Sequence, residues 1–554
     1  MNEIRTSCAP TDRQISSWES IDWNKCDLEV RKLQARIVKA QKEGRHGKVK
    51  SLQWLLTHSF AAKALAVKRV TSNNGKNTSG VDKVLWSTPV AKANAITELK
   101  RRDYNPMPLK RVNIRKSNGK LRPLGIPTMK DRAMQALYLM ALDPVAETTA
   151  DNHSYGFRKE RCTGDAIHQC YINLSKESSP QWVMEGDIKG CFDHISHNWL
   201  LNNIPMDKVM LRKWLKSGFI FNKQLFPTEE GTPQGGIISP TLANMTLDGI
   251  EKLLAENFPI HWPNKTTYYP KIHLIRYADD FIITARSKEE LEQRVLPLIR
   301  EFLQVRGLTL SEEKTKITHI DEGFDFLGFN IRKYKGKFLI KPSKESQKKF
   351  QRKINEIITS HHSIPQESLI RLLNPVITGW ANYYQHVVSG KVFQKLMQWS
   401  LRRHPAKGKW WVAEKYFHRH RGRSWVFAAP FDKDGRTELH PVKWLTDTKI
   451  TRYAKLKCDA NPYDPDWQEY FEKRETRLML QSAKGRNTIV RIWKRQQRKC
   501  PYCGEPITRN TPWRVSEKVV HGHTERTLVH SYCGRINVQP LKNEEYESVS
   551  QQKL

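Results

Sequence analysis

The chain has 554 residues, which is enough for two to four domains that each bury a hydrophobic core. Lys and Arg exceed Asp and Glu by 37, and 17 Trp, 17 Tyr and 19 Phe residues offer flat faces for bases, which favours a nucleic acid over a membrane surface as the partner. There is no run of 18 apolar residues and no apolar stretch behind a basic N-terminus, which excludes a membrane span and a secretory signal and predicts a cytoplasmic protein.

Two segments before residue 130 have a readable pattern. Residues 27–70 carry apolar side chains at helical spacing between basic ones, and the polar residues 71–80 follow, which predicts two helices and then a loop. Residues 111–127 alternate apolar and basic positions around a Ser-Asn-Gly sequence that favours a turn, which predicts a β-hairpin. The basic residues near its tip are Arg115, Lys116, Lys120 and Arg122.

The region from about residue 181 to 330 carries the acidic residues of interest. Apolar strand segments alternate there with helical segments, which predicts a mixed sheet covered by helices on one face. One strand ends at Asp187, and two others meet at the adjacent Asp279 and Asp280. An Asp-Asp pair alone would suit an ordinary surface turn. Like charges between apolar strands are costly unless a cation neutralises them, and Asp187 supplies a third ligand.

Three carboxylates on adjacent strands suit nucleotide transfer, in which two divalent ions activate a 3′-hydroxyl and shield the leaving pyrophosphate. The sequence Tyr277-Ala278-Asp279-Asp280, together with Asp187, resembles the palm of the reverse transcriptases that group II introns encode. The resemblance implies an α+β multidomain fold, namely a right-hand polymerase with fingers and palm, a helical thumb or maturase X domain, and a small C-terminal zinc-binding module. It also implies two catalytic Mg²⁺ ions held by the three carboxylates.

The same resemblance implies a set of substrate-binding residues. Lys116 and Arg122 on the hairpin are assigned to the triphosphate of the dNTP, where positive charge offsets that of the leaving pyrophosphate. Gln234 is assigned to the templating pair and the incoming nucleotide. Phe192 is expected to lie beneath the incoming sugar and to exclude a 2′-hydroxyl, which implies a DNA product. A solvated basic hairpin is the preferred interpretation of Lys120.

Three further motifs of the family follow. Residues 231–240 resemble its substrate loop, and Ser239 is expected to cap the helix that begins at Pro240. Residues 307–316 and 326–329 resemble the next two elements, and the second of these is expected to hold the primer terminus.

Residues 341–430 contain 17 Lys or Arg and only four acidic residues over mainly helical patterns, which predicts a clamp on nucleic acid. Residues 373–384 resemble the maturase domain, and their aromatic residues Trp380, Tyr383 and Tyr384 are expected to be core residues rather than stacking platforms. The resemblance covers about residues 20–430.

A coupled function follows from the resemblance. The protein is expected to bind its group II intron RNA, assist its splicing and copy it into DNA at a target site (retrohoming), in the bacterial cytoplasm or nucleoid. The implied partners are intron RNA, target DNA, the RNA template–DNA primer duplex and dNTPs, with no membrane. The alternative is an RNA-binding splicing factor or a domesticated, non-mobile reverse transcriptase. A splicing factor, however, has no physical need of a metal-binding carboxylate cluster.

The cysteines divide into scattered and clustered ones. The scattered ones suit a reducing compartment, and they are Cys8, Cys26, Cys162, Cys170, Cys191 and Cys458. Near the end of the chain, Cys500 and Cys503 are separated by 26 residues from His530 and Cys533, a spacing that predicts one structural Zn²⁺.

This C-terminal module resembles an HNH endonuclease domain but departs from it at the hydrolytic positions. The chain reads Val515-Ser-Glu-Lys-Val519 where the family has adjacent histidines, and the later Asn and His positions fall near Arg526 and Asn537. The alternative is that His521 and His523 replace the missing base and metal ligand through a shifted loop. We expect a zinc-stabilised DNA-binding remnant, with endonuclease activity left open.

The expected domains run in chain order. They are an N-terminal helical extension with the start of the fingers (1–85), fingers and palm (86–340), the thumb and maturase domain (341–430), a DNA-binding or linker region (431–494), the HNH-like zinc module (495–540) and a tail (541–554).

Overall fold

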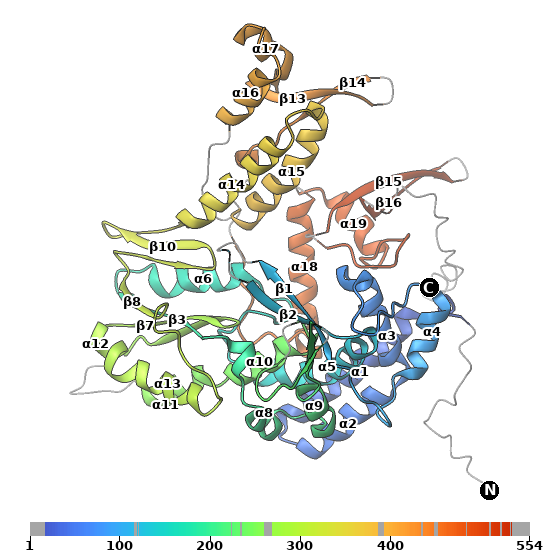
Figure 1. The fold of residues 1–554 in the computed structure, drawn as a ribbon, viewed down its shortest axis with the longest axis vertical. Helices are drawn as coiled ribbons and strands as arrows, with labels where there is room; N and C mark the ends of the chain where they lie inside the picture. The colour runs from blue at the N-terminus through green and yellow to red at the C-terminus, as the bar shows by residue number, and fades with distance from the viewer. Residues whose placement is uncertain are drawn as a thin grey trace, which may run out of the picture. The chain divides into compact units, whose positions relative to one another are not determined.

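The structure is a computed structural model that describes residues 17–533, apart from residues 116–118, 120, 223, 233–234, 260–268, 386–392, 434–435, 448–452, 484, 509–510, 521–522 and 532. The chain divides into two compact units, Met1–Asp459 and Ala460–Leu554. Figure 1 follows the elements along the chain. Among the described residues, no helix is both long enough and apolar enough to span a membrane.

The first unit begins with three helices where two were expected. They are α1 (Trp23–Lys42), α2 (His46–His58) and α3 (Phe60–Ser72). The additional break falls at Ser59, whose backbone is extended and whose hydroxyl accepts a hydrogen bond from the amide of Ala62 (3.2 Å). Such an N-cap starts a new helix. A further helix, α4 (Pro89–Glu98), packs against α3.

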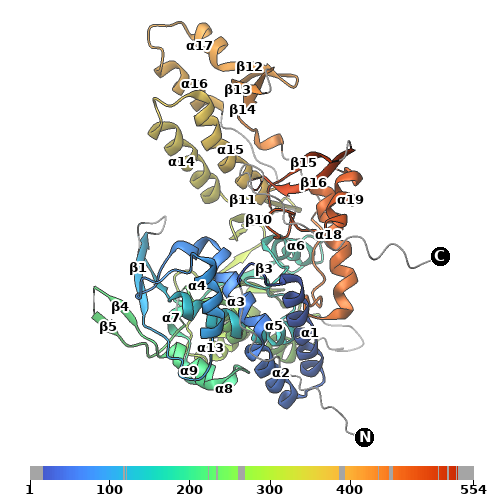
Figure 2. The ribbon, with the colours of Figure 1, turned by 90° about the vertical axis from the view of Figure 1, so that its right-hand side faces the viewer.

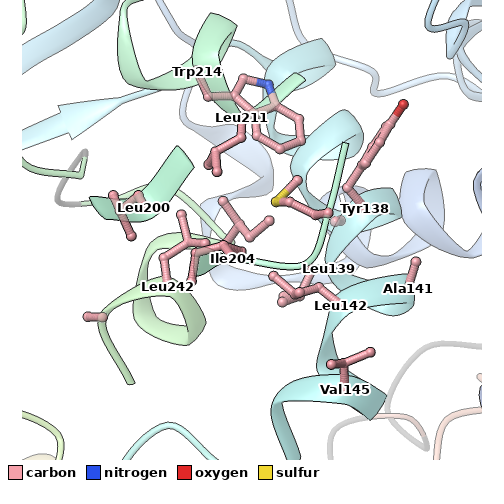
Figure 3. Close-up of a cluster of buried hydrophobic side chains, with 14 of the residues drawn as sticks. Tyr138, Leu139, Ala141, Leu142, Val145, Leu200, Ile204, Leu211, Trp214 and Leu242 are labelled. Atoms are coloured by element: carbon pink, nitrogen blue, oxygen red, sulfur yellow. The ribbon is translucent and has the colours of Figure 1, made fainter. Parts of the chain in front are cut away.

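The long helix α5 (Met129–Thr149) is central to the largest hydrophobic cluster of the first unit. Figure 3 shows its side chains gathered with those of three shorter helices. These are α8 (His197–Asn203), α9 (Lys208–Leu215) and α10 (Ser239–Leu247). This packing joins α5 to three helices that follow it further along the chain.

The expected hairpin is confirmed in its described residues and is part of a four-stranded sheet. Its strands are β1 (Leu109–Arg115) and β2 (Leu121–Ile126), which pair antiparallel, so that Arg122 lies opposite Ile114. β1 also pairs parallel with β4 (Phe219–Phe221), which pairs with β5 (Gln224–Phe226). Figure 2 shows these strands projecting side by side.

The four-stranded sheet that carries the predicted carboxylates is antiparallel throughout, where a mixed sheet was expected. Its order is β6-β7-β3-β8. The strands are β3 (Trp182–Asp187), β6 (His273–Tyr277), β7 (Asp280–Ala285) and β8 (Lys316–His319). Each strand therefore runs opposite to its neighbours. The periodicity of a strand predicts that it is a strand but not the direction of the strand that pairs with it.

Both faces of this sheet are covered, although helices on one face were expected. Alternate side chains point to opposite sides: Met184 belongs to the cluster with α5, whereas Val183 packs with helix α6. The helices that cover or flank the sheet are α6 (Thr163–Leu174), α7 (Cys191–His194), α11 (Ile250–Asn257), α12 (Lys288–Glu290), the π-helical turn Leu291–Val295 and α13 (Leu296–Gln304).

A second three-stranded sheet and a helical region follow. The sheet consists of β9 (Phe324–Phe326), β10 (Phe329–Tyr334) and β11 (Lys337–Pro342). The helices are α14 (Lys344–Ser360), α15 (Gln366–Tyr383), α16 (Phe393–Arg402) and α17 (Lys409–Tyr416). Figures 1 and 2 both show α14 and α15 side by side.

The structural region that contains these helices continues past residue 430, where a domain boundary was expected. That position lies inside β13 (Arg423–Lys433), which pairs with β12 (Phe417–His420) and β14 (Arg436–Pro441). Phe427 and Val442 pack in one hydrophobic cluster with α14 and α15. The strands therefore belong to the same core as the helices.

The second unit begins earlier than the expected boundary at residue 495. Its described elements are α18 (Gln468–Ser482), α19 (Asn487–Arg495), β15 (Trp513–Val520) and β16 (His523–His530). Met479 and Trp493 from the two helices pack with Cys500, Leu528 and Val529 in one core. The helices thus share a core with the first of the clustered cysteines rather than forming a linker before it.

Candidate active site and zinc cluster

The three predicted carboxylates converge at one end of the antiparallel sheet. Asp187, the last residue of β3, lies directly opposite Asp280, the first residue of β7. Asp280 also pairs with Tyr277, so that Ala278 and Asp279 form a two-residue turn between β6 and β7. Cross-strand partners have Cβ atoms about 5 Å apart, so the carboxylates share a small volume.

The turn requires an unusual backbone and a close neighbour. Ala278 has a left-handed backbone with φ of 59°, which is unfavourable for a residue with a side chain. Gly156 lies against it: a Cβ added at Gly156 would lie 2.3 Å from the amide nitrogen of Ala278. The loop that carries Gly156 is held by a bridge between Ser154 and Arg276 of β6. Packing therefore holds the turn in place.

Burial and repulsion between neighbouring carboxylates raise the pKa values of Asp280 and Asp279. Partial desolvation raises the pKa of Asp280 to about 6, and the charges of Asp279 and Asp187 add to the rise. Desolvation also raises the pKa of Asp279, an effect that Arg122 and Lys314 oppose. Oxygen ligands with mutual repulsion are suited to hard divalent cations, which would remove that repulsion. The donor set therefore fits Mg²⁺.

Lys314 is a site residue that the sequence analysis missed. Its Nζ donates a hydrogen bond to Oδ2 of Asp187 (2.7 Å), and this bond raises the pKa of Lys314. The segment is positioned by its backbone, because the amide of Ser311 donates to the carbonyl oxygen of Asp187 (2.8 Å). The available signal was that Lys314 lies inside the family motif at residues 307–316.

The predicted substrate residues Phe192 and Arg122 lie around this end of the sheet. The amide of Thr232 donates to the carbonyl oxygen of Phe192 (2.6 Å), and a Cβ at Gly231 would lie 2.7 Å from the same oxygen. The start of the substrate loop thus lies directly on the backbone of Phe192. The Phe192 ring packs edge-on against Phe157 with 6.3 Å between centroids. The charge of Arg122 reaches Asp279, as noted above.

Further along the same loop, Gly235 lies close to the β1–β2 hairpin. Gly235 has a φ of 119°, and a Cβ there would lie 2.5 Å from the carbonyl oxygen of Gly125 at the end of β2. The loop therefore bridges Phe192 and the hairpin. The predicted residues Lys116 and Gln234 lie outside the described residues, as does Lys120.

Ser239 does not act as the predicted helix cap. Helix α10 begins at Ser239 itself, with Ile238 in the N-cap position and Pro240 in the first turn. The Ser239 hydroxyl is buried and has no hydrogen-bond partner among the described residues. The amide of Ile237 instead donates to Oε1 of Gln135 on α5 (2.8 Å), which anchors the entry to the helix.

The segment at residues 326–329 forms the turn between β9 and β10. The hydroxyl of Tyr383 donates to the carbonyl oxygen of Leu327 (2.8 Å), and that of Tyr384 donates to the carbonyl oxygen of Gly328 (3.0 Å). Tyr384 is buried and the half-buried Trp380 stacks on Phe350, so these two are core residues as expected. Tyr383 is 41% exposed and differs from that expectation.

In the second unit, Cys500, Cys503, His530 and Cys533 converge. Their ligand atoms all lie within 4.8 Å of one another, and Nδ1 of His530 is 3.3 Å from Sγ of Cys503. Nε2 of His530 lies 3.2 Å from the carbonyl oxygen of Pro506, a partner that orients the ring with Nδ1 toward the thiols of Cys503 and Cys533. Three thiols and one imidazole in a compact group fit tetrahedral zinc.

The endonuclease positions have no catalytic arrangement in the described residues. Arg526 lies opposite Glu517 in the β15–β16 hairpin, and its Nε donates to Oε1 of Glu517 (2.9 Å). His521 and Asn537 lie outside the described residues, and so does the side chain of His523.

Three family models match the chain. They are the reverse transcriptase (RNA-dependent DNA polymerase) over residues 114–331, the N-terminal domain of reverse transcriptase over residues 18–99, and the group II intron maturase-specific domain over residues 347–417. Together they define a reverse transcriptase that carries a maturase domain.

Several curated proteins are similar to this chain. Protein YkfC of Escherichia coli (strain K12) is 32% identical over 50% of this chain and 81% of its own length. The group II intron-encoded protein LtrA of Lactococcus lactis subsp. cremoris is 31% identical over 48% of this chain and 54% of its own length, so the match spans about half of LtrA. The putative COX1/OXI3 intron 1 protein of Saccharomyces cerevisiae is 28% identical over 48% and 38%, respectively.

The chain belongs to the family of group II intron-encoded reverse transcriptases and maturases. By family it is an RNA-directed DNA polymerase. Among solved structures, apo telomerase from Candida Tropicalis aligns at 13% identity over 55% of this chain and 65% of that chain, with a TM-score of 0.34, and the family assignment does not depend on it.

Proposed function

We propose that Asp187, Asp279 and Asp280 hold two Mg²⁺ ions for nucleotide transfer. The observation that carries this proposal is the cross-strand pairing of Asp187 with Asp280 beside the Ala278–Asp279 turn, which gathers three mutually repelling carboxylates. When bound, the ions would activate the primer 3′-hydroxyl and stabilise the charge of the departing pyrophosphate. The carboxylates position the ions, and Lys314 neutralises Asp187 when no ion is present.

The residues around the carboxylates would select a deoxynucleotide. Lys116 and Arg122 are assigned to the triphosphate, Gln234 to the templating pair and Phe192 to the floor beneath the sugar. Arg122 is supported by its charge effect on Asp279, and Phe192 by its contact with the substrate loop. A ring under the sugar leaves no room for a 2′-hydroxyl, so the product would be DNA.

Sugar selection can be tested with Phe192→Ala. The variant should accept ribonucleotides about tenfold to a hundredfold better relative to deoxynucleotides, because a pocket gains space for one hydroxyl. Phe60→Ala is the matched control, since Phe60 is a 40% exposed ring at the start of α3 and has no assigned role in sugar selection. Unchanged discrimination in Phe192→Ala, measured as the ratio of kcat/KM values, would remove Phe192 from this role.

The whole protein would couple this polymerase to intron RNA and target DNA. The helices α14 and α15 and the region around them carry the excess of basic residues, which suits phosphate-rich RNA and the template–primer duplex. The second unit is assigned to target DNA as a zinc-stabilised binding module, with endonuclease activity left open. This arrangement would support splicing and retrohoming in the bacterial cytoplasm or nucleoid.

The coupled function is tested by separating its two parts. Asp279→Asn combined with Asp280→Asn should abolish extension of a DNA primer on intron RNA and leave intron binding and splicing intact, because the substitutions remove only ligand charge. The intron RNA is the one that flanks the coding sequence. If the well-folded natural protein splices this RNA but never extends a primer, the chain is instead an RNA-binding splicing factor.

A further inference from the structure

The last described residues of the first unit lie along helix α6. Residues 453–459 are termed the strap below. The amide of Leu456 donates to Oδ1 of Asp165 (2.7 Å), and Nη2 of Arg161 donates to the carbonyl oxygen of Cys458 (2.9 Å). The ring of Tyr453 occupies the space beside Gly164, where a Cβ would lie 2.6 Å from it. The strap is therefore held by specific contacts.

Cys458 of the strap is the first member of a chain of three side chains. Its Sγ lies 3.6 Å from Nε2 of His153, and Nδ1 of His153 lies 2.6 Å from Oε1 of Glu251 on α11. Glu251 also accepts a hydrogen bond from the amide of His153 (3.1 Å), so the carboxylate fixes both the ring and its backbone. In addition, Nζ of Lys455 donates to Sγ of Cys458 (3.1 Å). A nucleophile, a base and a group that orients the base are thus in line.

The charges in this group favour a thiolate. The hydrogen bond with His153 lowers the pKa of Cys458 to about 7 against the effect of burial, and Lys455 adds to the lowering. Burial lowers the pKa of His153, but its bonds to Cys458 and Glu251 outweigh that effect and raise the value to about 9. By contrast, burial and Asp165 raise the pKa of the nearby, half-buried Cys162.

This group differs from a metal site. Glu251 binds the imidazole nitrogen opposite to the one that faces the sulfur, so the three side chains form a line and cannot surround one ion. The convergent Cys and His cluster found among the described residues is the one in the second unit. Cys458 is half-buried, whereas Cys26, Cys170 and Cys191 of the same unit are buried. None of these residues has a role in nucleotide transfer.

We propose that Cys458 is a modification site at which a hydroperoxide oxidises the thiolate to a sulfenic acid, with His153 as the proton donor and Glu251 and Lys455 as positioning residues. The thiolate sulfur attacks one peroxide oxygen, an S–O bond forms and the O–O bond breaks. The departing hydroxide takes the proton from the His153 imidazolium, so hydrogen peroxide yields one sulfenic acid and one water. Sulfur is oxidised by two electrons and the peroxide is reduced by two.

The modified residue would lie close to the catalytic turn in the fold. The carbonyl oxygen of His153 accepts a hydrogen bond from the amide of Arg276 (2.9 Å), and Arg276 is on β6, which leads to Asp279. A neutral sulfenic acid loses its charge pairing with His153 and Lys455. Oxidation is therefore expected to loosen the strap from the loop that supports β6.

The test is peptide-resolved alkylation of the full, zinc-loaded chain by iodoacetamide across pH 5–10. We expect the reaction of Cys458 to have its midpoint near pH 7 and, at pH 7, to run on the order of fivefold faster than that of Cys162, since a larger thiolate fraction outweighs a lower nucleophilicity. Hydrogen peroxide followed by dimedone should label Cys458. A midpoint near pH 9, or no dimedone adduct at Cys458, would overturn the proposal.

Two variants test whether His153 and Glu251 cause the low alkylation midpoint of Cys458. His153→Gln and Glu251→Gln should both move the Cys458 midpoint toward pH 9 and slow its alkylation at pH 7 to the rate of Cys162. Glu256→Gln is the matched control on the same helix, because Glu256 is exposed and pairs with Lys252 (3.7 Å) rather than with His153. If the variants do not fold, the pH profile and dimedone labelling of the natural chain still decide the question. An unchanged midpoint in well-folded His153→Gln would refute the assignment.

Discussion

The two candidate metal sites of this protein are built in different ways. The palm carboxylates end strands of an antiparallel sheet whose two faces pack into two hydrophobic clusters, and Lys314 already neutralises one of them. The zinc cluster instead includes a member of its own small core, Cys500. Its three cysteines lie outside the helices and strands, and His530 ends the strand β16. In the first site the fold positions the ligands, whereas in the second the ion is expected to complete the fold.

The largest expected effect is on folding: the second unit should need its metal ion to stay folded, whereas the first unit should not. Chelation of zinc should open the second unit, because structural zinc contributes about 10 kcal/mol to the folding of such modules. Limited proteolysis with mass spectrometry should then cut within residues 460–533 and leave the first unit protected. Added Zn²⁺ should restore protection and added Mg²⁺ should not. Unchanged protection after complete chelation would show that this core needs no ion.

The next effect tests whether packing positions the palm site. Gly156→Ala should cost about 1–3 kcal/mol or more, because its new Cβ would lie 2.3 Å from the backbone of Ala278. The turn that carries Asp279 must shift, so primer extension should fall at least about tenfold. Gly47→Ala is the matched control, since a Cβ there meets nothing within 4 Å. Normal extension by Gly156→Ala would show that the turn tolerates movement.

The raised pKa of Asp280 should have a smaller effect, on the stability of the first unit. Because the pKa of Asp280 is raised to about 6 from 3.8, its neutral form stabilises the fold below about pH 4, and this contribution is lost as pH rises through 6. The partly exposed carboxyl is screened by solvent, so the loss should be about 1 kcal/mol. Thermal unfolding of the first unit without divalent ions should show it in the natural chain and not in Asp280→Asn. Parallel pH profiles would contradict the repulsion.

The smallest effect concerns Lys314. Its ammonium and a cation compete for Asp187, so Lys314→Ala should lower the Mg²⁺ concentration for half-maximal extension by up to about fivefold, the equivalent of an exposed ion pair worth at most 1 kcal/mol. Lys288→Ala, which removes the exposed pair between Lys288 on α12 and Glu292 on the π-helical turn (3.2 Å), is the control. A higher Mg²⁺ requirement in Lys314→Ala would show that Lys314 assists ion binding.

The sequence was informative where local patterns decide the structure. The hairpin that carries Arg122 and the strands that end in carboxylates follow from alternation and turn residues, both short-range signals. Three predictions were wrong because they depend on partners far away in the sequence. Ser239 does not cap its helix because its hydroxyl is buried, and residue 430 is not a boundary because β13 pairs with β14. The sheet is covered on both faces because α6 packs against the second one. Gly156 and Lys314 contact residues more than 100 positions away in the chain, and local spacing does not identify these partners, although Lys314 itself lies in a family motif.

The most direct test of the palm site is Mg²⁺-dependent primer extension on poly(rA)–oligo(dT) with dTTP. The natural chain should extend the primer, and Asp280→Asn should lose about a thousandfold in rate, because removal of an ion ligand forfeits several kcal/mol of transition-state stabilisation. Asp321→Asn, which changes an exposed carboxylate paired with His319 after β8, should extend normally. Extension by Asp280→Asn at the rate of Asp321→Asn would contradict the three-carboxylate site.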